Sequence, residues 1–321
     1  MNTRPKITEV NILLLIFVSL FLAFQFGVSI LATALSSIYT QEYYGNFLND
    51  NVLLLTLIIQ IGIILIPVLI FSLARKLDFK KVFRFNNPGF SPMLIILAAS
   101  VPAYFVAVML NSIFLYILQF IGQVPTSAIP SPGNLNELIV SLLVFAVTPA
   151  IAEEMMHRGV ILSAYERRGS QRAVIITAII FGLFHFDLSN LFGPVFLGIL
   201  IGNYVLRTNS IFAGMFAHFL NNAIATLLQY FAGKLPIQQE SANFSPDQLI
   251  IIIIIGIVSA AVLAGLILLF NFASRRKYKP VKAISTVRKD FSSVLSHWPV
   301  ILSLLMYLLM GAMFVISMKI S

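Results

Sequence analysis

Two short motifs place ionisable and amide side chains at helical spacing inside apolar stretches of the sequence. Glu153 and Glu154 precede Arg158, and His218 precedes Asn222. Glu154 and Arg158 are four residues apart, so on a helix they share a face and can form an ion pair that lowers the cost of burying both. Glu153 is then left without a counter-ion of its own, which suits a carboxylate that acts as a general base or acid. The first motif therefore predicts proton-transfer chemistry at Glu153.

The second motif and a single further histidine add groups that can assist such a reaction. His218 and Asn222 are also four residues apart, so they present two hydrogen-bond donors along one helix face and can hold an oxyanion. His185 follows Phe181 by one turn and can share a water molecule with Glu153. A structural role is the alternative for each group taken alone, because a Glu–Arg pair can brace a helix and a lone histidine can bridge two helices.

The elements that must position these residues are membrane spans. Hydrophobic residues make up 59% of the 321 positions and charged residues only 10%, whereas soluble domains carry about 25% charged residues. A transmembrane helix needs about 20 apolar residues. Nine stretches are candidates: 10–35, 52–74, 93–122, 138–162, 173–186, 191–206, 211–231, 249–273 and 299–318. We therefore predict an all-α fold, a polytopic transmembrane helical bundle of about eight or nine spans. Gly198 and Gly202 predict close helix packing in the sixth stretch.

The basic residues predict the orientation of these spans. The chain carries 21 Lys and Arg against 12 Asp and Glu, a formal net charge of +9. If the nine stretches alternate in direction, almost all basic residues fall on one side, most densely at 275–289, and the opposite loops contain a single base, Lys234. By the positive-inside rule, that side and the N-terminus are cytoplasmic. We expect a multi-pass protein of the cell membrane, in contact with lipid, and the sparse charge argues against a nucleic-acid partner.

This orientation predicts that the polar residues share one layer of the membrane. At about 1.5 Å per helical residue, Glu153, His185 and Asn222 each lie roughly 20 Å from the cytoplasmic end of their stretch, and His218 lies one turn closer. His157, four residues after Glu153, can face that carboxylate or serve as packing. A charge at the centre of a span costs about 2.5–3.5 kcal/mol on insertion scales. Several such groups at one depth indicate a functional site near the middle of the membrane.

Absent motifs narrow the chemistry further. The sequence contains no Cys, which excludes disulfides, cysteine nucleophiles and thiolate zinc sites. It also contains no HExxH metalloprotease motif, no GxGD motif, no GxSG serine motif and no Walker-type phosphate loop. Catalysis would have to use carboxylate, imidazole or hydroxyl groups, or a metal ion held by them.

Three motifs, taken in order, resemble those of one known family. Residues 153–158 read EEMMHR and have the form EExxxR, residues 181–185 read FGLFH and have the form FxxxH, and residues 218–222 read HFLNN and have the form HxxxN. Together they resemble the CPBP family of intramembrane proteases, which includes the type II CAAX prenyl endopeptidases and the bacterial Abi proteins linked to bacteriocin immunity. The resemblance divides the chain into N-terminal spans at 1–137, a CAAX-protease-like core at 138–231 and C-terminal spans at 232–321.

The resemblance implies an intramembrane endopeptidase acting on a peptide or a membrane protein. It implies three pairs of roles: Glu153 and His185 activate the attacking water, His218 and Asn222 stabilise the tetrahedral oxyanion, and Glu154 and Arg158 brace the site. One branch of the family cleaves after a prenylated cysteine, but the sequence shows no feature that would distinguish prenyl recognition from an ordinary apolar lining. The substrate within this class is therefore left open.

Alternatives to this interpretation concern the metal and the class of protein. The family has been described both as metal-dependent and as glutamate-dependent without metal, and Glu153, His185 and His218 would be the ligands if zinc were bound. We expect no cofactor, with zinc as the alternative, because HExxH is absent and His218 already has an oxyanion role. Carboxylates and histidines at this depth also suit a proton-coupled transporter. A member without proteolytic activity would be a membrane scaffold or immunity factor.

Overall fold

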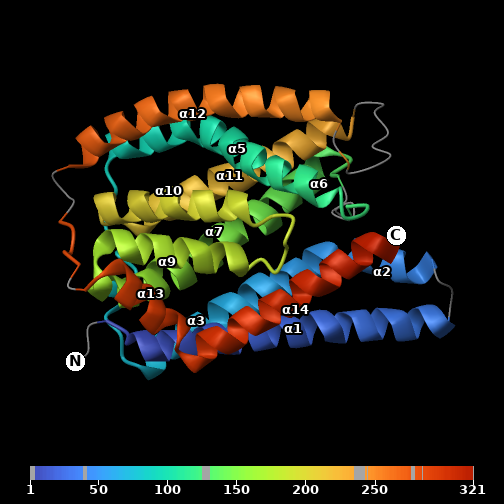
Figure 1. Cartoon of the computed structure of the whole chain (residues 1–321), viewed down its shortest axis with the longest axis horizontal. Helices are drawn as coiled ribbons and strands as arrows, with labels where there is room; N and C mark the ends of the chain where they lie inside the picture. The colour runs from blue at the N-terminus through green and yellow to red at the C-terminus, as the bar shows by residue number, and fades with distance from the viewer. Residues whose placement is uncertain are drawn as a thin grey trace.

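The protein is an elongated bundle of helices (Figure 1). The computed structural model describes residues 4–38, 42–124, 131–234, 243, 245–275, 279–283 and 285–320, and within these residues no strand occurs. Most helices run along the long axis of the bundle, and the two termini lie towards opposite ends of it (Figure 1).

The chain order groups the helices into three blocks. The N-terminal block comprises α1 (Ile7–Ile38), α2 (Glu42–Leu57), η1 (Ile58–Leu65), α3 (Ile66–Ala74), α4 (Phe79–Val82) and α5 (Phe90–Leu118). The central block comprises α6 (Leu135–Leu142), η2 (Leu143–Val147), α7 (Thr148–Glu154), η3 (Met155–Ile161), α8 (Leu162–Tyr165), η4 (Glu166–Arg168), α9 (Ser170–Leu183), α10 (Phe192–Thr208) and α11 (Ile211–Ala232). The C-terminal block comprises α12 (Pro246–Ser274), α13 (Val287–Leu295) and α14 (Trp298–Ile320).

Several consecutive elements join into long rods that can cross a membrane. Seven helical stretches of the described residues are long and apolar enough to do so: Ile7–Ile38, Phe47–Ala74, Phe90–Leu118, Leu135–Arg168, Ile211–Ala232, Pro246–Ser274 and Trp298–Lys319. This confirms the predicted all-α, polytopic fold class.

Helices α9 and α10, which correspond to the fifth and sixth predicted stretches, are shorter. They have 14 and 17 residues, or about 21 and 26 Å at 1.5 Å per residue, whereas the hydrocarbon core of a bilayer is about 30 Å thick. Their connection stops partway along the bundle (Figure 1). Two of the nine predicted stretches therefore form an antiparallel pair that ends inside the bundle.

Local sequence signals account for several helix ends. The Ser245 side chain accepts a hydrogen bond from the backbone of Gln248 at the start of α12, in a capping box followed by a proline. Asn134 caps α6 in the same way by accepting from the backbone of Glu137. Helix α10 ends at Thr208, and the next residue, Asn209, has a left-handed φ of 50° that ends the helical course.

Close packing of α10 against α9 occurs at the predicted glycine pair. A Cβ on Gly198 would lie 2.9 Å from Cα of Ala178, and one on Gly202 would lie 3.1 Å from the Val174 side chain. The first distance is too short for any larger residue unless a backbone moves. The predicted small-residue contact is thus confirmed, and it brings the two short helices together beside the core.

Three π-helical segments of the described chain surround α7. They are η1, η2 and η3, and α7 contacts all three of them. Such segments are often found at functional sites because the wider turn redirects side chains. Pro149 near the start of α7 has no N–H and cannot donate to the carbonyl of Phe145, four residues earlier. The sequence therefore leaves a backbone acceptor free beside α7.

Candidate active site

The rod that runs from α6 to η4 carries the acidic motif into the interior. Glu153 and Glu154 end α7, and Arg158 lies in η3. The exposed fractions of these three residues are 6%, 0% and 1%. Burial of this degree requires partners for each charge, because an isolated charge in an apolar interior is strongly destabilising.

Glu154 is the centre of a buried ion cluster. Its Oε1 accepts a hydrogen bond from Nη1 of Arg158 at 2.8 Å and faces Nδ1 of His218 at 2.9 Å. The Arg158 guanidinium also lies 4.5 Å from the centre of the Phe181 ring and donates to the Gly198 carbonyl at 3.4 Å. The predicted pairing of Glu154 with Arg158 is therefore present in the structure, and His218 joins it from α11.

Glu153 has a different environment from its neighbour. Its Oε1 accepts a hydrogen bond from Nε2 of Gln60 in η1 at 2.8 Å. Its Oε2 is buried, has no hydrogen-bond partner, and lies 3.9 Å from Nε2 of His218. One oxygen of this carboxylate is therefore held by a neutral amide, and the other is available.

His218 stands between the two carboxylates. Nδ1 faces Glu154 and Nε2 faces Glu153. A proton on Nδ1 is fixed by the Glu154 carboxylate, so the second proton, when present, is on Nε2 and points towards Glu153. With that proton the cluster of two carboxylates, one guanidinium and one imidazolium carries no net charge, which is the arrangement least costly to bury.

His185 lies just beyond α9 rather than within a helix as predicted. Its Nδ1 is 2.8 Å from the carbonyl of Phe181, one of the acceptors left free at the end of that helix. Because a carbonyl can only accept, Nδ1 carries the proton and Nε2 has a free lone pair in the neutral ring. The helix end thus selects the tautomer and orients the ring.

Asn222 uses the carbonyl that Pro149 leaves free. Its Nδ2 donates to the Phe145 carbonyl at 3.1 Å, and its Oδ1 accepts from Nδ2 of Asn221 at 3.2 Å. These two contacts fix which end of the amide carries the donors. The second hydrogen of Nδ2 takes part in neither of these two contacts.

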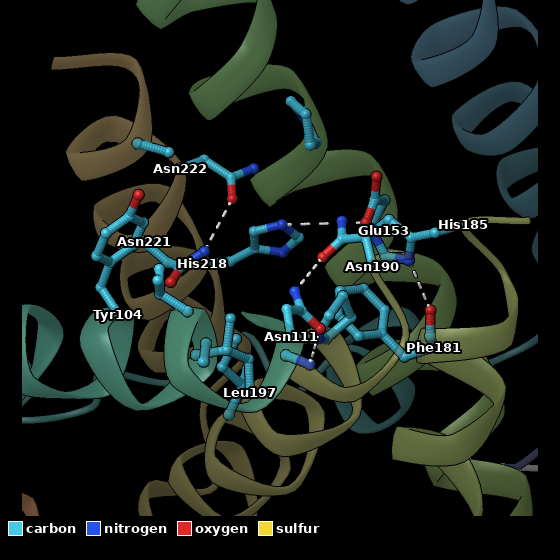
Figure 2. Close-up of a pocket in the computed structure, with 17 residues that line it drawn as sticks. Tyr104, Asn111, Glu153, Phe181, His185, Asn190, Leu197, His218, Asn221 and Asn222 are labelled. Carbon is cyan, nitrogen blue, oxygen red and sulfur yellow. Dashed lines mark hydrogen bonds and ion pairs between the residues drawn. The ribbon is translucent and has the colours of Figure 1, made fainter. Parts of the chain in front are cut away.

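A cavity of about 330 Å³ joins these groups. Figure 2 shows Glu153, His185, His218 and Asn222 around it, together with amide side chains from other helices. The polar lining consists of Tyr104, Asn111, Glu153, His185, Asn190, His218, Asn221 and Asn222. Four of the six predicted site residues thus line one cavity, and Glu154 and Arg158 lie behind it.

Sequence reasoning missed several polar residues of this region. Gln60 is the single amide of the stretch 52–74, and Asn111 is one of two amides in the stretch 93–122. The rarity of amides in these stretches was the available signal. Asn111 donates to Asn190 at 2.5 Å and accepts from the backbone N–H of Gly193 at 2.7 Å, so it ties the start of α10 to α5. Asn190 lies in the loop before α10, where an amide is ordinary and gives no signal.

His157 does not reach the cavity. It is fully buried, with its ring packed edge-on against Phe181 and Phe184, and its Nδ1 is 2.9 Å from the backbone carbonyl of Glu153. It faces Glu153 through the backbone rather than through the carboxylate. The packing alternative therefore describes it better.

The zinc alternative requires three donors that converge on one point. Within the described residues, no group of three His, Asp or Glu side chains is close enough to hold a metal ion. His218 has its Nδ1 committed to Glu154, and His185 has its Nδ1 committed to a carbonyl. The donor set of Glu153, His185 and His218 is chemically suitable for zinc, and these contacts leave Nε2 of both histidines as the donor atoms.

Fold and site together define a polytopic membrane protein with a buried carboxylate–imidazole cluster beside a small cavity. Residues 135–224 match the family described as "Type II CAAX prenyl endopeptidase Rce1-like". This range contains all three motifs, and the resemblance to the CPBP and CAAX protease family is thereby confirmed.

One curated relative supports the same resemblance. Over 103 residues the chain is 30% identical to the Bacillus subtilis (strain 168) protein named "Putative membrane peptidase YdiL". The alignment covers 32% of this chain and 42% of that protein, so less than half of either length is compared. No solved structure matches the chain.

Proposed function

We propose that this protein is a membrane-embedded endopeptidase that hydrolyses a peptide bond with a water molecule activated by Glu153. The observation that carries the proposal is the free oxygen of Glu153: Oε2 is buried, has no partner, and belongs to a residue that lines the cavity opposite His218. A buried carboxylate oxygen without a donor is costly, and it is the group that a general base requires.

The reaction follows from the positions of the groups around the cavity. A water molecule is held by Oε2 of Glu153 and by the free Nε2 of His185. Glu153 takes one proton as the water oxygen attacks the substrate carbonyl carbon, and the carbonyl oxygen becomes negative. When the C–N bond breaks, the proton on Glu153 passes to the leaving amine. The products are a carboxylic acid and an amine.

The negative oxygen would be held by donors on α11. His218 supplies Nε2–H when its ring is protonated, and Asn222 supplies the second hydrogen of its amide. Both are fixed in advance, by Glu154 and by the Phe145 carbonyl, and such preorganised donors stabilise charge that develops in the transition state. Glu154 and Arg158 thus brace the oxyanion donors rather than contact the substrate.

The substrate we propose is a peptide or membrane protein whose cleaved bond reaches the interior of the bundle, and the chemistry requires no metal ion. The N-terminus would be cytoplasmic, as the basic residues predict. The proposed substrate class is supported by the family match and by the cavity beside α9 and α10.

Cleavage can be tested on membranes from cells that lack the protein. Purified wild-type protein, Glu153→Gln and His185→Ala are each incubated with these membranes, and newly formed amino termini are identified by mass spectrometry. We expect new termini with wild type, none with Glu153→Gln, and a reduction of about 100-fold or more with His185→Ala.

Asn203→Ala is the matched control, because Asn203 is a half-buried amide on α10 outside the cavity. A second arm repeats the wild-type reaction after chelator treatment. If Glu153→Gln releases the same termini as wild type, the protease proposal fails. If chelation abolishes cleavage and zinc restores it, the metal-free mechanism fails while proteolysis stands.

A further inference from the structure

An amide from outside the family-matched segment touches the proposed general base. Gln60 lies in η1, within the rod of α2, η1 and α3, whereas the family match covers residues 135–224. Its Nε2 donates to Oε1 of Glu153 at 2.8 Å, and the Gln60 residue is 8% exposed. The contact joins the N-terminal block directly to the acidic motif.

Stability alone does not account for an amide at this position. The carbonyl oxygen of Gln60 is buried and has no hydrogen-bond partner, and such an unsatisfied polar group costs about 1–3 kcal/mol. The neighbours in η1 are isoleucine, glycine and leucine. An apolar side chain in place of Gln60 would remove that penalty but would leave Oε1 of Glu153 without its donor.

The contact makes the two oxygens of Glu153 unequal. Oε1 is occupied by Gln60, and Oε2 has no partner and is the oxygen nearest to Nε2 of His218. A donor on one oxygen fixes the rotation of the carboxylate, so the other oxygen is held in one place. Gln60 itself does not line the cavity, and it would therefore act only through Glu153.

The donor is also neutral, in contrast to the partner of Glu154. Arg158 places a full positive charge beside Glu154, which offsets the charge of that carboxylate. An amide N–H stabilises and orients a carboxylate without cancelling its charge. The structure thus gives two adjacent glutamates different partners that suit different tasks.

We infer that Gln60 is a positioning residue that holds Glu153 so that its Oε2 faces the water to be activated. This inference rests on the proposed function, because it assigns a role in that reaction. It also implies that the N-terminal block is part of the active site and not only a membrane anchor.

The test replaces Gln60 by side chains that alter only the donor. Gln60→Met keeps the length and shape but removes the N–H, and Gln60→Asn keeps the amide but withdraws it by one methylene. The control is Thr56→Val, one turn earlier on the same rod, where the hydroxyl bonds only to the Val52 carbonyl. The probe is a quenched synthetic peptide that spans the bond cleaved fastest by wild type in the membrane assay.

We expect kcat to fall between about tenfold and 100-fold in Gln60→Met, with KM within about twofold of wild type and an unchanged Tm. Gln60→Asn should show the same selective loss of kcat, and it serves as the scored variant if Gln60→Met does not fold. Thr56→Val should match wild type in all three quantities.

A wild-type kcat in Gln60→Met would overturn the inference. It would also be overturned if Thr56→Val showed the same loss of kcat as Gln60→Met. Glu153→Gln is measured in parallel on the same peptide. If Glu153→Gln cleaves normally, the proposed function itself has failed, whereas its inactivity combined with an active Gln60→Met contradicts only the role of Gln60.

Discussion

At the scale of single residues, adjacent glutamates have separate environments. Glu154 has a guanidinium and an imidazole within 3 Å of Oε1, whereas Oε1 of Glu153 has one amide. Oε2 is without a hydrogen-bond partner in both residues, but only Glu153 lines the cavity. Part of this difference could be predicted from the sequence, because the spacing of Glu154 and Arg158 predicts their pairing. It follows that removing Arg158 damages the fold, and that removing Glu153 removes chemistry.

The ion pair predicts a large loss of stability from a single change. Arg158→Met leaves Glu154 buried without its guanidinium, and breaking a buried pair in this way costs about 3–5 kcal/mol. Arg167→Met is the control, because Arg167 is exposed and should change the free energy of unfolding by no more than about 0.5 kcal/mol. Unfolding in detergent measures both. Equal stabilities of the two variants would show that the buried pair contributes nothing.

At the scale of helices, the short pair α9 and α10 positions the cavity. Because these helices end inside the bundle, the connection between them brings His185 and Asn190 to the cavity rather than to a membrane surface. The length of apolar stretches alone did not reveal this, since 173–186 and 191–206 were interpreted as spans. The depth argument nevertheless placed the three motifs in one layer, and the structure brings them to one cavity.

The contact of Gln60 with Glu153 could not be predicted from the sequence. The spacing of residues along one helix predicts pairs such as Glu154 with Arg158, or His218 with Asn222. A partner on another helix has no such signal, because which face of the α2–η1–α3 rod meets α7 depends on packing. The same holds for His218 with Glu154, which are 64 positions apart.

The contact between α9 and α10 predicts the effect of adding one methyl group. In Gly198→Ala the new Cβ would lie 2.9 Å from Cα and Cβ of Ala178, so the helices must separate, at a cost of about 1–3 kcal/mol for overpacking. Gly265→Ala on α12 is the matched control, because nothing lies within 4 Å of that position. Thermal unfolding in detergent should show a lower Tm for Gly198→Ala only. If both variants have the Tm of wild type, the close approach of α9 and α10 is absent.

At the scale of the whole molecule, one attachment of the C-terminal block to the central block involves α13 and the segment before it. Asp290 of α13 is fully buried and accepts a hydrogen bond from Arg168 at 2.9 Å, with further contacts from Arg172 and Ser285. The backbone of Ser170 donates to the Val281 carbonyl at 3.0 Å. The run 275–289, predicted as a basic cytoplasmic loop, therefore contacts the start of α9 at Val281 and Ser285, and Arg276 and Lys277 lie outside the described residues.

Docking of this segment should depend on pH. Burial raises the pKa of Asp290, but the hydrogen bonds from Ser285, Arg172 and Arg168 lower it by more, so the pKa lies below its ordinary value of 3.8. Because the pKa is lower in the docked state, ionisation of Asp290 stabilises docking above about pH 4, and this contribution is lost as the pH falls through the docked-state pKa.

Hydrogen exchange of residues 279–295 measures this docking directly. Wild type should show protection at pH 7 that weakens below about pH 4, and Asp290→Asn should show reduced protection at both. Asp247→Asn, in the exposed first turn of α12, is the control and should exchange like wild type. Full protection in Asp290→Asn at pH 7 would contradict a docking role for this carboxylate.

The central claim is that Glu153 activates the water that hydrolyses a peptide bond. The most direct measurement is the release of new amino termini from membranes by purified Glu153→Gln, a change that keeps the size of the side chain and removes its basic oxygen. The account predicts a folded protein with the Tm of wild type and no detectable cleavage. Cleavage of the same bonds at the wild-type rate by Glu153→Gln would contradict it.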